Sequence, residues 1–242
     1  MSEAGRSVRV GLATDVGRVR EHNEDAAFAR GSIFVVADGM GGHAAGEVAS
    51  AIAASTLGEL ADRTDLTVDD VVAQLTEANH RIVQSGIANP RTWGMATTLT
   101  GAALVVGEDG GRAWAIVNLG DSRVYRYAAG ALTQVTVDHS EVQEMVNRGY
   151  LTDAEARVHP LRHTVTRSLG RDRVPVADTW VLPVVVGERF VVCSDGLTNE
   201  VLDAQIASLL GEVADVQAAA RALVDAAVAN GGRDNVTVIV VE

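Results

Sequence analysis

The chain has 242 residues, of which 47% are hydrophobic and 4% aromatic, so it can bury a sizeable core and is neither disordered nor fibrous. Its 32 acidic and 20 basic residues give a net charge of −12, which argues against binding to nucleic-acid backbones or anionic membranes. Every basic residue is an arginine, and without lysine the chain has neither a Walker A nucleotide loop nor a Schiff-base lysine.

The first third of the chain is typical of two strands followed by two helices. Residues 8–14 and 32–37 are apolar enough for strands. In residues 44–60, apolar side chains recur every three or four positions, which predicts one buried helix face. A second helix is expected over 68–88, with Thr67 as its N-cap and two aspartates in its first turn.

The middle of the chain is rich in predicted strands. Four strand-like runs occupy residues 96–106, 112–119, 122–128 and 132–137. The connections GEDGG, GD and AG are too short for parallel crossovers, so each is expected to join antiparallel neighbours.

The last part begins with a polar excursion over residues 139–165, with two short helical patterns, which we interpret as a flap or binding subdomain. Two strands, two helices and a final strand then follow, at 174–181, 189–193, 203–210, 215–229 and 235–241. This order predicts a single α+β domain over residues 1–242, with sheets covered by helices.

The lone cysteine, Cys193, excludes an intramolecular disulfide and a zinc site built from cysteines. No apolar run approaches the roughly 18 residues of a membrane span, and the first ten residues lack a signal-peptide core. We therefore expect the cytoplasm, or the cytoplasmic face of the membrane if the chain is part of an anchored protein.

Aspartates recur at the ends of apolar strands. Asp38, Asp121 and Asp195 each follow such a run and adjoin a glycine, whereas Asp234 precedes the last strand. An Asp-Gly pair often only turns the chain, as expected at Asp109 in the GEDGG hairpin. Several carboxylates gathered at one sheet edge would repel one another unless cations separated them, and oxygen ligands suit Mg²⁺ or Mn²⁺.

These motifs, in this order, resemble the metal-dependent protein serine/threonine phosphatases of the protein phosphatase 2C type in their compact bacterial form. The matching stretches run nearly end to end: REHNED, VVADGMGGH, GMATTLT, NLGDSRVYR, TVDHS, HTVTRSLG, VVCSDGLT and GGRDNVTVIVV. The resemblance implies an α-β-β-α fold, in which two antiparallel sheets form a sandwich flanked by helices on both sides.

The resemblance also implies roles for single residues. It makes Asp38 the bridge between two Mn²⁺ or Mg²⁺ ions, with the Gly39 carbonyl on the first ion. It places Asp195 and Asp234 on the second ion, and Asp121 with Asp195 at a weaker third site. The catalytic set is then Asp38, Asp25, which would orient water, and Arg20, which would bind phosphate; Glu24 and Asn235 would lie just outside it.

The implied reaction is hydrolysis of phosphoserine or phosphothreonine by water activated between two cations. Met40 stands where eukaryotic relatives carry a histidine, and His43, three residues later, is not equivalent to it. A water on the third ion is therefore our candidate proton donor, while His139 and His163 are expected to be structural or to face the substrate. The expected partners are phosphorylated proteins, notably serine/threonine kinases and their substrates.

Three other interpretations fit parts of the sequence. Residues 39–44 fit a dinucleotide-binding pattern, but Asp38 would face the pyrophosphate and a second helix stands where a strand is required. A cysteine phosphatase is disfavoured because Cys193 lies near Asp195 and has no arginine shortly after it. The remaining alternative is a pseudophosphatase, a non-catalytic binding or regulatory module on the same fold, although such a protein is expected to have lost metal ligands.

Overall fold

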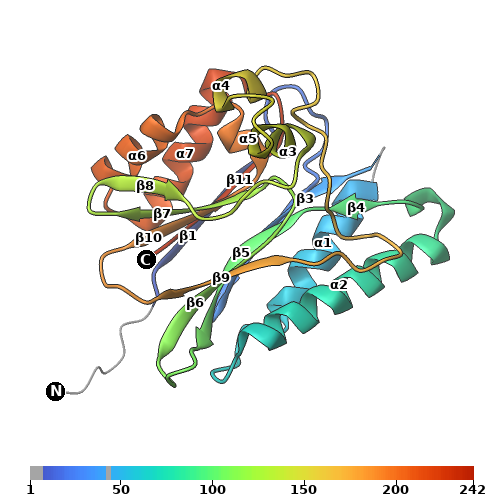
Figure 1. Ribbon diagram of the computed structural model, residues 1–242, viewed down its shortest axis with the longest axis horizontal. Helices are drawn as coiled ribbons and strands as arrows, with labels where there is room; N and C mark the ends of the chain where they lie inside the picture. Colours follow the sequence, from blue (N-terminus) through green and yellow to red (C-terminus); the bar gives the residue numbers. More distant parts are fainter. Residues whose placement is uncertain (1–7, 42–44) are drawn as a thin grey trace.

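The computed structural model describes residues 8–41 and 45–242 and consists of two antiparallel sheets stacked face to face between two helical layers (Figure 1). The five-stranded sheet has the order β1-β11-β10-β7-β8, with bounds Val10–Asp15, Val236–Val241, Arg189–Cys193, Arg123–Ala128 and Ala131–Gln134. The six-stranded sheet has the order β2-β3-β5-β6-β9, with bounds Asp25–Arg30, Ile33–Met40, Leu99–Val106, Arg112–Leu119 and Asp178–Pro183, while β4 (Ala96–Thr97) pairs with β3.

The helices cover the outer faces of both sheets, as Figure 1 shows. Helices α1 (Ala45–Gly58) and α2 (Val68–Ala88) cover the six-stranded sheet, and α6 (Asp203–Glu212) and α7 (Val216–Asn230) cover the five-stranded one. The short helices are η1 (Pro90–Thr92), α3 (Glu141–Asn147), α4 (Asp153–Ala156) and α5 (Asp195–Thr198). The predicted α-β-β-α sandwich is confirmed. No helix in the described ranges combines the length and apolar character needed to cross a bilayer.

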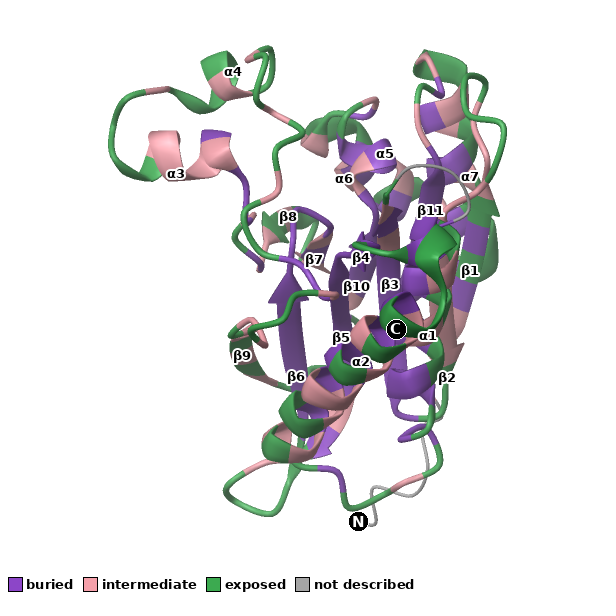
Figure 2. Cartoon of the chain, turned by 90° about the vertical axis from the view of Figure 1, so that its right-hand side faces the viewer, coloured by how far each residue is buried: buried purple, intermediate pink, exposed green. Residues whose placement is uncertain are grey.

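Strand alternation produces three separate cores. Along β3, Ile33 and Val35 face the α1/α2 layer, whereas Phe34 and Val36 face the other sheet. Between the sheets Trp114 contacts Phe34 and Phe190, with ring centroids 5.9 and 5.4 Å apart. Figure 2 shows these strands buried along nearly their whole length. Strands buried on both faces explain why the apolar runs of the sequence are continuous rather than alternating.

Several elements differ from the prediction. The strand expected over 174–181 is β9, which begins only at Asp178 and extends to Pro183. Strand β2 was not predicted, because its sequence, DAAFAR, has no strong apolar run and its pairing with β3 is what defines it. The expected strand over 96–106 is broken at Thr98 into β4 and β5. Helix α5 was also missed, since only four residues form it.

The GD connection does not join antiparallel neighbours. The other two short connections do, linking β5 to β6 and β7 to β8. At Gly120, however, the chain leaves the six-stranded sheet and enters the five-stranded one, so β6 and β7 lie in different layers. Gly120 permits this turn because its φ is +114° and an added Cβ would lie 2.5 Å from Thr98 Cγ2. Loop length therefore cannot distinguish a hairpin from a change of sheet.

Residues 139–165 leave the sandwich and return to the same place. The base of the excursion is closed by a bridge between Ser140 and Val165 and by two backbone hydrogen bonds of His139 and Glu141, with Thr166 and Thr164. Figure 2 shows α3 and α4 projecting beyond the sheets at the end where α5 lies. The segment has the form expected of a flap, and its role in binding remains a prediction.

Candidate active site

The predicted aspartates come from both sheets and meet at one end of the sandwich. Asp25 and Asp38 lie directly opposite each other in the β2–β3 ladder. Asp195 follows β10, Asp234 precedes β11, and Asp121 lies at the crossing between the sheets. A cleft of about 1230 Å³ opens there, and its walls include Arg20, Asp38, Asp121, Asp195 and Asp234 as well as residues of the 139–165 segment. Asp25 is not part of the cleft wall, although it is the direct cross-strand partner of Asp38.

The pKa shifts of these carboxyl groups agree with their lying close to one another. The pKa of Asp38 is raised well above its usual value, mainly by burial and then by repulsion from Asp25, Asp195, Asp121 and Asp234. Burial likewise raises the pKa of Asp121, with Asp195 as the next cause, and raises that of Asp25 to about 7. Like charges this close favour either protonation or a cation.

Two buried carboxylate oxygens have the surroundings expected of cation ligands. Asp25 Oδ1 and Asp195 Oδ1 are buried and accept no hydrogen bond, although buried polar atoms normally have a partner. Within residues 8–41 and 45–242, no three His, Cys, Asp or Glu side chains already have the spacing of metal ligands. The all-oxygen donor set of these aspartates fits a hard divalent cation.

Arg20 reaches the site but is paired. Its Nη2 donates to Asp234 Oδ2 at 2.8 Å, and this hydrogen bond is the main reason why the pKa of Arg20 is raised. The side chain is 53% exposed and lines the cleft, so its remaining donors can reach a ligand there. The residue that we expected to bind phosphate therefore also contacts an expected metal ligand.

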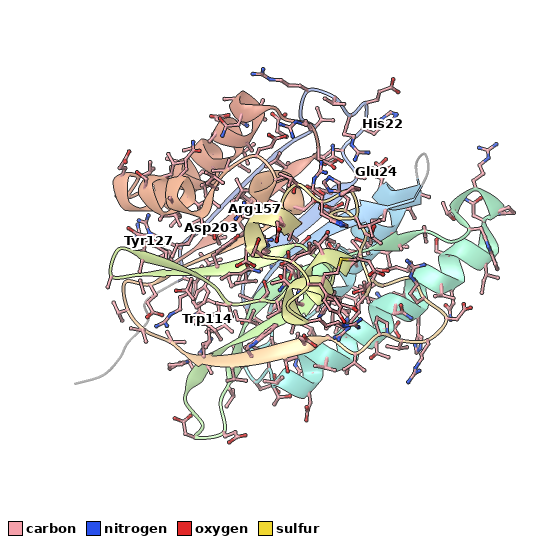
Figure 3. All side chains as sticks on the ribbon, turned by 45° about the horizontal axis from the view of Figure 1, so that its top comes forward. His22, Glu24, Trp114, Tyr127, Arg157 and Asp203 are labelled. Atoms are coloured by element: carbon pink, nitrogen blue, oxygen red, sulfur yellow. The ribbon has the colours of Figure 1, made fainter. Side chains whose placement is uncertain are left out.

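Asn235 organises the loop that carries Arg20. Its Oδ1 accepts the Glu24 backbone N–H at 2.8 Å, and its Nδ2 donates to the carbonyls of Val16 and His22 at 3.0 and 2.9 Å. All three polar positions of the amide are thus used by the backbone. Figure 3 shows Glu24 and His22 on this loop at the same end of the molecule. This matches the expectation that Asn235 lies just outside the catalytic set.

Backbone hydrogen bonds hold Asp38 and Gly39 in place, and the close approach of Gly46 leaves no space for a side chain at Gly39. The Gly39 N–H donates to the Glu24 carbonyl at 3.1 Å, and a Cβ added to Gly39 would lie 2.3 Å from the Gly46 carbonyl oxygen. The Asp38 N–H donates to Thr98 Oγ1 at 2.9 Å, and Thr98 Oγ1 is also 2.9 Å from Ser122 Oγ. Thr98 was not singled out in the sequence, although the GMATTLT stretch contains it.

The histidines differ in their surroundings. His139 is buried: its Nδ1 accepts the Gly120 N–H at 3.2 Å and its Nε2 lies 3.1 Å from Asp178 Oδ2. Burial is the main cause that lowers the pKa of His139. His163 is half exposed in the cleft, with Nδ1 3.7 Å from Asp195 Oδ2. His43 lies outside the described residues. Cys193 is a buried strand residue whose pKa burial raises to about 12, which agrees with the rejection of a cysteine phosphatase.

Other residues of the cleft were missed at the sequence level. Arg123 forms a charge-assisted pair with Asp138, with Nη2 and Oδ2 2.7 Å apart, and lines the cleft beside Asp121. Arg157, from the end of α4, lies 3.8 Å from Asp203 at the start of α6 (Figure 3). Both pairs depend on chain segments that only the tertiary structure brings together.

Comparison with known proteins places this site in a family. A family model described as "Protein phosphatase 2C" matches residues 17–230. The serine/threonine protein phosphatase PstP of Mycobacterium tuberculosis is 39% identical over 239 residues, covering 97% of this chain and 45% of that protein. The serine/threonine phosphatase stp of Listeria welshimeri is 34% identical, covering 95% of this chain and 93% of its own length.

A solved structure agrees with the sequence comparison. The crystal structure of the catalytic domain of PstP in complex with two manganese ions is 36% identical, with a TM-score of 0.86 and 97% of both chains covered. This chain spans about half the length of the curated PstP relatives that it matches. With sequence, fold and the order of the aspartate motifs in agreement, the chain belongs to the protein phosphatase 2C family.

Proposed function

We propose that the chain is a divalent-metal-dependent phosphatase that hydrolyses phosphoserine and phosphothreonine in proteins. The observation that carries the proposal is the meeting of Asp38, Asp121, Asp195 and Asp234 at one cleft, with Asp25 opposite Asp38 in the strand ladder. The named relatives are serine/threonine phosphatases, and the cleft is open enough to admit a side chain of a phosphoprotein.

The residues of the site would bind either metal ions or the phosphate group. Asp38 and the Gly39 carbonyl would hold one Mn²⁺ or Mg²⁺ ion, and Asp38, Asp195 and Asp234 a second. When bound, such cations supply positive charge and lower the pKa of a coordinated water. Arg20 would grip phosphate oxygens with its planar guanidinium, which can donate two parallel hydrogen bonds.

Asp121 and Asp195 would hold a third, weaker cation, which would acidify nearby water, and we propose this water as the source of the proton for the leaving alkoxide. Asp121 is 8% exposed, and after burial the charge of Asp195 is the next cause that raises its pKa, which supports a cation shared by the two carboxylates. We further propose that the enzyme acts in the cytoplasm, or at the cytoplasmic face of the membrane, on serine/threonine kinases and their substrates.

A metal-dependent assay tests the function. Hydrolysis of p-nitrophenyl phosphate should require Mn²⁺, stop on addition of a chelator and return when metal is restored. Asp38→Asn should abolish it, since this residue would contact both ions. Well-folded protein without Mn²⁺-dependent hydrolysis would instead support the pseudophosphatase alternative, which nothing in the site favours because all four expected aspartate ligands are present.

A further inference from the structure

A group of hydroxyl side chains lies behind the cleft and does not line it. Ser194, the residue before Asp195, is fully buried and absent from the cleft wall, as is Thr237 of β11. Neither can touch a substrate in the cleft. The hydroxyls of both residues nevertheless act on the Asp25 carboxylate, and Asp25 is the one expected catalytic residue that does not line the cleft either.

Ser194 makes a hydrogen bond between the two sheets. Its Oγ donates to Asp25 Oδ2 at 2.8 Å, so that a residue at the end of β10 holds a carboxylate at the start of β2. The same Oγ accepts the Thr237 N–H at 3.0 Å, and the Ser194 N–H donates to the Thr237 carbonyl at 3.1 Å. Because Ser194 Oγ accepts the Thr237 N–H, the hydroxyl proton of Ser194 is directed at Asp25.

The chain of contacts closes on the Asp25 backbone. Thr237 Oγ1 lies 2.8 Å from Thr14 Oγ1, and these two residues are direct cross-strand partners in β1 and β11. Asn23 Nδ2 donates to Thr14 Oγ1 at 2.9 Å, while Asn23 Oδ1 accepts the Asp25 N–H at 3.1 Å. Four residues, Ser194, Thr237, Thr14 and Asn23, thus form a ring from the Asp25 carboxylate to the Asp25 amide, with the Thr237 backbone N–H as one of its links.

The ring holds the Asp25 carboxylate in a position where it is repelled by another carboxylate. Asp25 stands directly opposite Asp38 in the strand ladder, where like charges repel, and its Oδ1 has no hydrogen-bond partner. The hydroxyls of Ser194 and Thr237 both favour the ionised form of Asp25. Without them the carboxylate would be free to turn away from Asp38.

We propose that Ser194 is a positioning residue, which holds the Asp25 carboxylate in its working orientation from the opposite sheet, with Thr237, Thr14 and Asn23 completing the support. The proposal rests on the function proposed above for Asp25. A merely structural tie between the sheets is the competing explanation, and it predicts a loss of stability without a specific effect on turnover.

Steady-state kinetics with Mn²⁺ separate the two explanations. Ser194→Ala should lower kcat about ten- to a hundredfold, the range for a hydrogen bond to a charged group, and leave KM unchanged. Ser194→Thr keeps the hydroxyl and should recover most of kcat. In an Asp25→Asn background Ser194→Ala should cost nothing further, because its target is gone. An equal loss in both backgrounds would overturn the proposal.

Two further variants keep the test decisive. Thr237→Val removes the supporting hydroxyl at constant volume and should lower kcat about two- to tenfold, again only when Asp25 is present. It replaces Ser194→Ala if that variant fails to fold. Ser32→Ala is the matched control: this buried hydroxyl donates to the Arg63 carbonyl outside the cleft, and kcat should stay at the wild-type value.

A measurement without turnover separates this inference from the proposed function. The Asp25 carboxyl ¹³C resonance, assigned by its loss in Asp25→Asn, should shift in Ser194→Ala and stay unchanged in Ser32→Ala. An unshifted resonance in Ser194→Ala would overturn the positioning role even if the wild type were active. A shifted resonance in an inactive wild-type background would support it and refute only the phosphatase proposal.

Discussion

Replacing Asp25 by asparagine should stabilise the metal-free protein while impairing its catalysis. Burial and the neighbouring aspartates raise the pKa of Asp25 from 3.8 to about 7. A carboxyl group whose folded-state pKa lies above its unfolded value binds more protons when folded, so the free energy of unfolding falls as pH rises from about 4 to about 7. Asparagine is never charged and removes this penalty.

The size of the gain follows from the shift. At about 1.4 kcal/mol per unit, roughly three units set an upper limit near 4 kcal/mol. The asparagine also loses the charge-assisted part of the Ser194 hydrogen bond, which offsets about 1–2 kcal/mol. We therefore expect Asp25→Asn to raise the free energy of unfolding by about 1–3 kcal/mol at pH 8 and by much less at pH 5.

Urea denaturation in the presence of a chelator, at pH 5 and pH 8, measures this difference. The exposed Asp172→Asn serves as the control for the same chemical change and should show no pH-dependent gain. Mn²⁺ should stabilise the wild type more than Asp25→Asn, since a bound cation relieves the same repulsion. An Asp25→Asn variant that is equally or less stable than the wild type at pH 8 would refute the electrostatic reasoning.

Four further outcomes are expected. Arg20→Ala should raise KM for a phosphopeptide about ten- to a hundredfold, and Arg20→Lys should be intermediate because it keeps the charge but loses the planar fork; an unchanged KM in both would remove Arg20 from phosphate binding. Asp121→Asn should slow phosphopeptide hydrolysis more than hydrolysis of p-nitrophenyl phosphate, whose leaving group needs no proton, and equal slowing would contradict the proposed proton donor. Thr67→Ala should lower the free energy of unfolding by about 1 kcal/mol through loss of the α2 capping box, with kcat unchanged; a fall in kcat would show that the helix end affects the site. Shortening residues 141–165 should change the preference among phosphoproteins more than small-substrate hydrolysis, whereas shortening the 107–111 hairpin should change neither; equal selectivity in both variants would remove the flap from substrate recognition.

Elements defined by local signals could be predicted closely. Helix α2 was expected over 68–88 and is found there, because Thr67 and Asp70 form a capping box that sets its start. The capping hydrogen bonds from Thr67 are also the main cause that lowers the pKa of Asp70 to about 2, so their contribution is present near neutral pH and lost as pH falls from about 4 to about 2. Strands β6 and β10 were likewise predicted with their observed bounds.

Features that depend on distant partners could not be predicted in this way. Strand β2 is defined by its ladder with β3, and the change of sheet at Gly120 depends on the packing of two layers. Four aspartates were found from a local pattern, because each adjoins an end of an apolar strand: Asp38, Asp121, Asp195 and Asp234. The role of Asp25 was predicted only from the family resemblance. Ser194 and Thr237 were not found, because their contacts with Asp25 and Thr14 join residues that are 169 and 223 positions apart.

The change of sheet at Gly120 places Asp121 between the two sheets, at the end of the sandwich where the other aspartates lie. A site made of ligands from a single sheet would be confined to one layer, but here Asp25 and Asp38 come from one sheet and Asp195 and Asp234 from the other. Side chains from two stacked sheets can meet at an end of the sandwich, where loops leave both layers and solvent is within reach. Asp121 stands on the short crossing between them, and Ser194 ties the end of β10 to Asp25 on β2. Charge repulsion among these aspartates disfavours the contact between the sheets at this end, whereas the hydrogen bond of Ser194 favours it. The cations that we propose would relieve the same repulsion, so metal binding should stiffen the contact between the sheets.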